Sequence, residues 1–163
     1  MAGLKLADGD YGIEDLNGVF GSQGFRNEKE LCDFVEANIE AFCMELGISM
    51  AAYERESYIT RIAIFGKGNR PRVDFLIKET GGGVTLVEAK HPRNLYREVN
   101  MGISQILDYI LIAEKEGIKV NKAVILTSAC NRQVLGVIKR FDLPIDVVLI
   151  SKDAIAVWQK EVG

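Results

Sequence analysis

The chain has no apolar run long enough to cross a membrane. Its 163 residues contain no stretch near the roughly 18 apolar residues that a transmembrane helix needs, and the first twelve residues, MAGLKLADGDYG, have no apolar signal core. We therefore expect a cytoplasmic protein with no membrane partner.

Cysteine is scarce, and no nucleotide-binding loop is present. Cys32, Cys43 and Cys130 are odd in number and form no Cys-x-x-Cys pair, so we expect reduced thiols and no structural zinc site. The sequence also lacks a G-x-x-x-x-G-K-[ST] phosphate loop, so it does not encode ATP-driven work.

Positive charge is in the minority, but it is concentrated. The chain has 20 Lys and Arg against 23 Asp and Glu, a net charge of −3 that by itself argues against nucleic acid. Residues 61–97, however, hold eight basic and three acidic residues, so this window carries +5 and the remainder −8. A local basic field on an acidic body suits binding of a phosphate backbone at one face. The alternative is a chance cluster of solvated charges.

The pattern of apolar and turn residues predicts one α/β domain. An apolar content of 48% is ordinary for a globular protein, and the length allows one domain with a real core. We expect an N-terminal arm or short hairpin over residues 1–26 and a single domain over 27–163. The expected order is αβββαβαβ, a mixed sheet flanked by helices. The expected elements are a helix over 27–46, strands over 58–65, 72–78 and 84–89, a helix ending near 116, a strand over 123–127, a helix over 131–141, a strand over 146–150 and a last edge strand over 154–158.

The segment RPRVDFLIKETGGGVTLVEAK, residues 70–90, reads as two short strands joined by a Gly-Gly-Gly turn. Asp74 lies on the first strand. Glu88 and Lys90 lie on the second, on one face because they are two residues apart. Their neighbours are apolar, and buried charges are costly unless they are paired or bound to a metal.

This arrangement predicts a site for a hard divalent cation, Mg²⁺ or Mn²⁺. Asp74 and Glu88 supply carboxylate oxygens and Ala89 a backbone carbonyl, while water and substrate phosphate complete the shell. Lys90 is then placed to orient the attacking water, stabilise developing charge or accept a proton. The alternative is a solvent-facing strand edge with alternating charge.

Asp74, followed fourteen residues later by Glu88-Ala89-Lys90, resembles the motif of the PD-(D/E)XK nuclease superfamily. The usual Pro before the Asp is Val73 here. The resemblance covers roughly residues 27–127, the αβββαβ core of that superfamily, and implies a restriction-endonuclease-like fold. It also implies Mg²⁺- or Mn²⁺-dependent hydrolysis of DNA phosphodiester bonds, with Asp74 and Glu88 as ligands and Lys90 as the catalytic amine.

Glu28 is an acidic residue in an apolar position. Helical spacing puts it on the same side as Cys32, Val35, Ile39 and Leu46. In the superfamily that the hairpin resembles, an acidic residue on this helix often completes the metal site, so the resemblance gives Glu28 that role. The alternative is a first-turn glutamate that is stabilised by the helix dipole and faces water.

Gln105 and Tyr109 are four residues apart on the long second helix, so they lie on one flank, which Gly102 shares. Gly102 allows another backbone or a ligand to approach closely. The pair follows Lys90 by fifteen residues and resembles the Gln-x-x-x-Tyr motif of one superfamily branch, which includes RecB-type nuclease domains and lambda exonuclease. The resemblance implies that both side chains organise the site and the bound strand. A plain surface pair is the alternative.

Basic residues flank the motif on both sides. Arg70, Arg72, Arg93 and Arg97 are the expected nucleic-acid contacts, through phosphate oxygens. For Arg93 and Arg97, solvated charges at a helix start are an equal alternative. His91, the only histidine, is expected to be a polar residue at a strand end rather than a ligand.

Three functions stay in competition. The first is a metal-dependent deoxyribonuclease, with DNA as partner and association into a homo-oligomer left open. The second is a catalytically inactive nucleic-acid-binding or assembly module on the same fold, against which the retention of Asp74, Glu88 and Lys90 together argues. The third is an unrelated α/β interaction domain with a chance motif. No separate recognition domain is visible, which favours structure- or end-dependent cleavage over recognition of a long site.

Overall fold

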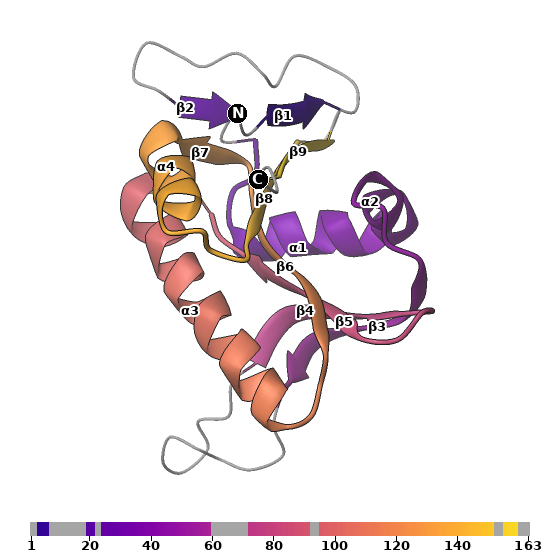
Figure 1. Cartoon of the computed structure of the whole chain (residues 1–163). Helices are drawn as coiled ribbons and strands as arrows, with labels where there is room; N and C mark the ends of the chain where they lie inside the picture. Colours follow the sequence, from indigo (N-terminus) through magenta and orange to yellow (C-terminus); the bar gives the residue numbers. More distant parts are fainter. Residues whose placement is uncertain are drawn as a thin grey trace.

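The computed structural model describes residues 3–6, 19–21, 24–59, 72–91, 95–151 and 155–159, with side chains described within 24–59, 72–91, 99–130 and 132–151. Figure 1 shows a sheet with helices on either side. The elements are β1 (Gly3–Leu6), β2 (Val19–Gly21), α1 (Glu28–Ala37), α2 (Ile39–Glu45), β3 (Met50–Tyr58), β4 (Arg72–Glu79), β5 (Val84–Ala89), α3 (Leu95–Lys115), β6 (Val120–Thr127), β7 (Ala129–Asn131), α4 (Arg132–Arg140), β8 (Asp146–Ile150) and β9 (Ile155–Gln159).

The main sheet has the strand order β1-β9-β8-β6-β5-β4-β3, and β2 pairs with β7 separately. β4 pairs antiparallel with both β3 and β5, whereas β6 pairs parallel with both β5 and β8. The α/β class, the mixed sheet and the flanking helices agree with the prediction. The order of elements from α1 to β8 also contains the predicted αβββαβαβ series.

α1 and α2 cover one face of the sheet. Leu31, Val35 and Phe42 are fully or almost fully buried, and they pack in one cluster with Phe75 of β4 and Val87 of β5. Apolar residues at helical spacing thus meet alternate residues of the central strands, as the two periodicities require. This packing holds the start of α1 against the sheet.

α3 and α4 cover the other face. Val99 and Ile106 of α3 and Val134 of α4 pack in one cluster with Ile125 and Val147. β5 is buried along its whole length because it lies between β4 and β6 and has helices on both faces. Any polar side chain on β5 is therefore taken out of water.

Several predicted elements agree with the structure, and one helix is divided. Strands are present at the expected 72–78, 84–89, 123–127 and 146–150, as are the long second helix and α4. The single helix expected over residues 27–46 is wrong, because it breaks at Asn38 between α1 and α2. The Asn38 side chain donates to the carbonyl oxygen of Phe34, and such local bonds compete with a continuous helix.

The edge strand β3 is the main element that the sequence analysis missed. The strand expected over residues 58–65 falls outside the described residues except for its first two, and the structure places a strand earlier, at Met50–Tyr58. Most of its residues are exposed. A charged, exposed edge strand lacks the apolar signal by which strands are recognised.

The two ends of the chain also differ from expectation. β1 and β2 do not form a hairpin, because β1 pairs with β9 and β2 with β7. The strand expected over 154–158 is present as β9, but it is not an edge strand, since β1 lies outside it. These pairings join segments far apart in sequence, which no local pattern reports.

The three cysteines are free and buried. Among the described helices, none combines the length and apolar character needed to cross a lipid bilayer.

Candidate functional site

The hairpin of β4 and β5 brings the two predicted carboxylates together. The strands pair antiparallel with Phe75 opposite Val87, so the next position along places Asp74 beside Glu88. The turn between them needs residues in the left-handed region, which Gly82 (φ 92°) and Gly83 (φ 79°) supply. The glycine run therefore sets the register that joins the two acids.

Asp74 is tied to the end of β5. Its Oδ2 accepts a hydrogen bond of 2.8 Å from the backbone N–H of Ala89. Burial raises the pKa of Asp74 and the negative charge of Glu28 adds to the shift, while the Ala89 N–H and Lys90 oppose it. The Ala89 peptide, expected to offer its carbonyl to a cation, thus also holds one of the acids in place.

Glu88 and Lys90 form a buried ion pair on the face predicted for them. Their side chains are 7% and 9% exposed, and Lys90 Nζ lies 3.4 Å from Glu88 Oε1. The second carboxylate oxygen, Glu88 Oε2, is buried and has no hydrogen-bond partner. A buried acceptor without a partner carries a desolvation cost that a bound cation or a proton would remove.

Burial and the charge of Asp74 raise the pKa of Glu88. Burial is the larger cause for Glu88 and the charge of Asp74 the second, and together they raise the pKa of Glu88 to about 8 against the opposing effect of Lys90. Two neighbouring carboxylates that resist joint ionisation are an arrangement that a divalent cation relieves. Perturbed acids of this kind are more frequent at functional sites than elsewhere.

Glu28 reaches the same strand end from α1. Asn27 caps the helix by accepting from the N–H of Glu30, so Glu28 is the first helical residue. Its Oε1 lies 3.4 Å from the backbone N–H of His91, which donates to it, and its charge raises the pKa of Asp74. Glu28, half-buried at the start of α1, therefore lies near Asp74 and the end of β5.

His91 has a position that the sequence analysis did not anticipate. Its ring is buried, and Nε2 lies 2.6 Å from the carbonyl oxygen of Phe25, so Nε2 carries the proton. Nδ1 is buried without a partner. His91 thus ties the segment before α1 to the end of β5, and a separation of 66 residues along the chain explains why no local signal revealed it.

Gly102, Gln105 and Tyr109 of α3 lie near the ion pair of Glu88 and Lys90. A Cβ at Gly102 would lie 2.8 Å from Cγ of Lys90, so the lysine stem crosses the helix there. Gln105, one turn further on, has a buried Oε1 without a partner. Burial first, and then the charges of Glu88 and Asp74, raise the pKa of Tyr109 to about 12. The Gln-x-x-x-Tyr flank therefore faces the acidic cluster.

Of the four predicted phosphate-binding arginines, only Arg72 has a described side chain. Its guanidinium lies 3.6 Å from Glu56 and 6.0 Å from the ring centre of Tyr58, in an exposed position. Arg70 and Arg93 lie outside the described residues, and Arg97 lies in the first turn of α3 with a side chain that is not described.

The backbone is distorted opposite Asp74. Arg55 pairs with Phe75 and Ser57 with Val73, which leaves Glu56 across from Asp74. Glu56 has φ 53°, a left-handed conformation that is uncommon for glutamate. The edge strand is therefore irregular beside the carboxylates.

The donors present fit a hard cation held mainly by two acids. Within the side chains that the structure describes, no three or more His, Cys, Asp or Glu residues are grouped to hold a metal ion. Mg²⁺ does not need such a group, because it usually keeps several waters and binds one or two carboxylates together with substrate phosphate. The unpartnered oxygens of Glu88 and Gln105 are acceptors of the right kind. No family model and no curated protein matches the chain.

Proposed function

We propose that the protein is a Mg²⁺- or Mn²⁺-dependent nuclease that hydrolyses phosphodiester bonds in DNA, with a PD-(D/E)XK site on a restriction-endonuclease-like core. The observation that carries the proposal is the buried trio of Asp74, Glu88 and Lys90, in which Glu88 Oε2 has no partner and burial and Asp74 raise the pKa of Glu88 to about 8. Buried charged groups of this kind destabilise an apo protein and are more frequent at functional sites than elsewhere.

Each residue has a role that follows from its place. Asp74 and Glu88 would hold the cation, which supplies charge stabilisation to the phosphoryl group when bound. The Lys90 Nζ lies 3.4 Å from Glu88 Oε1. Its positive charge would therefore stand where the attacking water and the developing negative charge would lie. Gln105 offers its unpartnered amide oxygen as an acceptor for the attacking water.

The supporting residues hold this geometry. The Ala89 N–H orients Asp74, and the His91 N–H orients Glu28. Tyr109 stays protonated at neutral pH, because its pKa is raised to about 12, and it can therefore donate a hydrogen bond to a phosphate oxygen. Positioned donors and charges of this kind are what phosphoryl transfer demands of a protein.

The competing function is an inactive nucleic-acid-binding or assembly module on the same fold. A module that only binds would gain nothing from two buried carboxylates next to its polyanion. The unsatisfied Glu88 oxygen therefore favours the enzyme.

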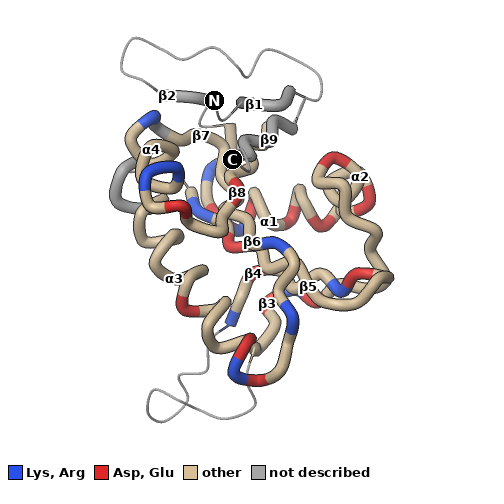
Figure 2. Tube along the Cα trace, in the orientation of Figure 1, with Lys and Arg blue, Asp and Glu red and all other residues tan. Residues whose placement is uncertain are grey.

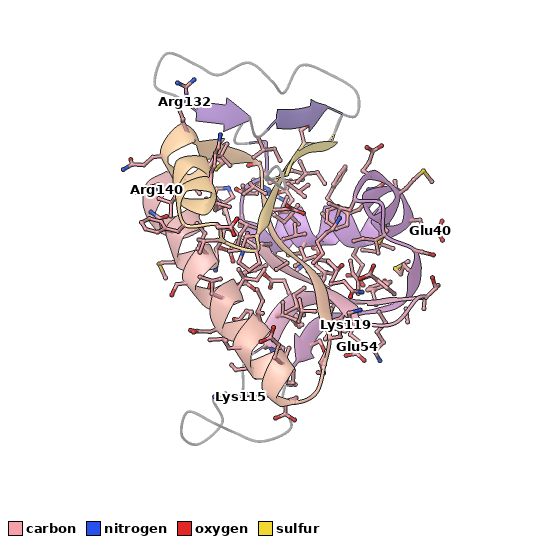
Figure 3. The ribbon with its side chains drawn as sticks, viewed as in Figure 1. Glu40, Glu54, Lys115, Lys119, Arg132 and Arg140 are labelled. Carbon is pink, nitrogen blue, oxygen red and sulfur yellow. The ribbon has the colours of Figure 1, made fainter. Side chains whose placement is uncertain are left out.

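The test is a digestion panel of linear, circular, single-stranded, flapped and branched DNA with Mg²⁺ or Mn²⁺. We expect wild-type protein to cleave at least one substrate, with ends or structures favoured, and Asp74→Ala, Glu88→Ala and Lys90→Ala each to abolish cleavage. Glu54→Ala removes an exposed carboxylate of β3, labelled in Figure 3, and should cleave as wild type does. Wild-type rates from the Glu88→Ala protein would remove the central claim, and binding without cleavage by wild type would favour the inactive module.

A further inference from the structure

Among the helices that the structure describes, α4 is the basic one. It carries Arg132, Lys139 and Arg140 and no acidic residue, whereas acidic residues outnumber basic ones in each of α1, α2 and α3. Figure 2 shows the positive residues at both ends of α4. The nearest acid that follows in sequence is Asp142, just beyond the helix.

The basic residues share the outward side of the helix. Its inward side packs Val134, Leu135 and Ile138 into the core. The outward side presents Arg132, Gln133, Gly136, Lys139 and Arg140, all exposed. Gly136 has open space where a side chain would stand, so a bound chain can approach the backbone there.

Helix stability accounts for only part of this charge. Lys139 and Arg140 lie in the last turn, where cations are favoured by the helix dipole. Arg132 is the first helical residue, where the same dipole opposes a cation. The helix dipole therefore explains the cations at the end of α4 but not the exposed cation at its start.

We propose that the outward side of α4 (Arg132, Lys139 and Arg140, with Phe141) binds the phosphate backbone of a nucleic acid beside the cleavage site. Arg132 and Arg140 are separated by about 12 Å along the axis at 1.5 Å per residue, a length that spans about three phosphates of one duplex strand. Phe141, 69% exposed at the helix end, offers a ring on which an unpaired base stacks.

α4 is also correctly placed relative to the proposed site. It packs on the half of α3 that contains Val99, Ile103 and Ile106, and the same half carries Gly102 beside Lys90. α4 therefore lies beside the part of α3 that contacts Lys90. The identity of the polyanion rests on the proposed nuclease function, but the existence of the binding surface does not.

The experiment compares two pairs of neutralised cations. Lys139→Gln/Arg140→Gln tests α4. Lys115→Gln/Lys119→Gln is the matched control, because Lys115 is the last residue of α3, as Arg140 is of α4, and both control lysines are exposed. Figure 3 shows Arg132 and Arg140 at one end of the molecule and Lys115 and Lys119 at the other. Affinity for a labelled duplex and for a single strand is measured by fluorescence anisotropy, without metal, from about 50 to 200 mM salt.

We expect the α4 pair to weaken binding at least about tenfold and to reduce the log–log salt slope by about 2, one for each lost phosphate contact. The control pair should change neither quantity. Phe141→Ala should weaken binding of the single strand more than that of the duplex. An equal loss of affinity in both double variants would show that binding depends on the overall charge of the protein, and it would overturn the proposal. Unchanged affinity in the α4 double variant would also overturn it.

Cleavage and lipid binding separate this proposal from the nuclease. Cleavage of DNA by the α4 pair with wild-type KM would overturn the surface and leave the nuclease standing. DNA binding that depends on α4, in a protein that cleaves no substrate, would support the α4 surface and overturn the nuclease. Vesicles of phosphatidylserine that bind through α4 when DNA does not would overturn nucleic acid as the partner.

Discussion

The side chain of Lys90 lies across Gly102, the glycine of α3. A Cβ on that residue would stand 2.8 Å from Lys90 Cγ, 3.4 Å from Lys90 Cε and 3.2 Å from Ile125 Cδ1. The first of these distances is shorter than real Cβ contacts allow. The absence of a side chain at Gly102 is therefore what lets the lysine run from the end of β5 to Glu88.

Gly102→Ala should displace the Lys90 amine. We expect a lower cleavage rate at saturating DNA, with stabilisation by Mg²⁺ retained, because the two acids are untouched. Stability should also fall, although alanine is the better helix former by about 1 kcal/mol. Urea unfolding and single-turnover cleavage are the measurements.

Gly136→Ala is the control for stability, since a Cβ there meets nothing within 4 Å and should stabilise α4. The decisive comparison is Gly102→Ala in a Lys90→Ala background. With the lysine stem removed, the alanine should become neutral or stabilising. An equal loss of stability in both backgrounds would show that Lys90 is not the residue that Gly102 accommodates.

Asp74→Asn should stabilise the apo protein and abolish its response to metal. The asparagine oxygen can still accept from the Ala89 N–H, the Glu88–Lys90 pair remains, and the repulsion between the acids disappears. Wild type should gain about 2.7 kcal/mol at a Mg²⁺ concentration of 100 Kd. In a chain of this size, each kcal/mol raises the melting temperature by about 2–4 °C.

Differential scanning fluorimetry with EDTA and with a Mg²⁺ or Mn²⁺ titration provides the measurement. Glu54→Gln, an exposed acid, should keep the wild-type metal response. A wild-type melting temperature indifferent to millimolar metal, both with and without DNA, would count heavily against the cation site.

The apo protein should lose stability as the pH rises from about 5 to about 8. Burial and Asp74 raise the pKa of Glu88 from its usual value of 4.5 to about 8 in the folded state. Between these values the folded protein holds a proton that the unfolded chain has released, so the free energy of unfolding falls as the pH rises. The urea midpoint in EDTA across this range is the readout.

Glu88→Gln should flatten this dependence, because the titrating group is gone. Saturating Mg²⁺ should oppose the trend, since a cation binds the deprotonated carboxylate. A wild-type profile that rises with pH in EDTA, or one that Glu88→Gln leaves unaltered, would contradict the assignment.

His91→Ala should destabilise the start of α1. The substitution leaves the carbonyl of Phe25 without its 2.6 Å donor, a loss of about 1–3 kcal/mol for a buried group. Hydrogen exchange should increase in residues 25–32 more than in β8. His91→Gln restores a donor and should recover part of the loss, whereas uniform exchange across the chain would exclude a local anchoring role.

The sequence predicted the parts of the site that depend on local spacing. Asp74, Glu88 and Lys90 come together because strand alternation and a glycine turn determine their relative positions over 17 residues. The helical spacing of Gln105 and Tyr109 likewise placed both on one flank of α3, and the structure places Tyr109 near the acids. Periodicities of two and 3.6 residues are properties of the chain itself.

The tertiary structure alone determined the contacts between residues that are distant in the chain. The bond from His91 to Phe25, the crossing of Lys90 over Gly102 and the pairing of β1 with β9 leave no trace in any short window. The exposed edge strand β3 was also missed, because its charged residues interrupt the alternation of apolar and polar residues that indicates a strand. The sequence by itself determined the α/β class and the acidic hairpin, because these follow from local alternation. Packing of helices on the sheet decided which groups became buried, paired or left without partners, because burial depends on the whole fold.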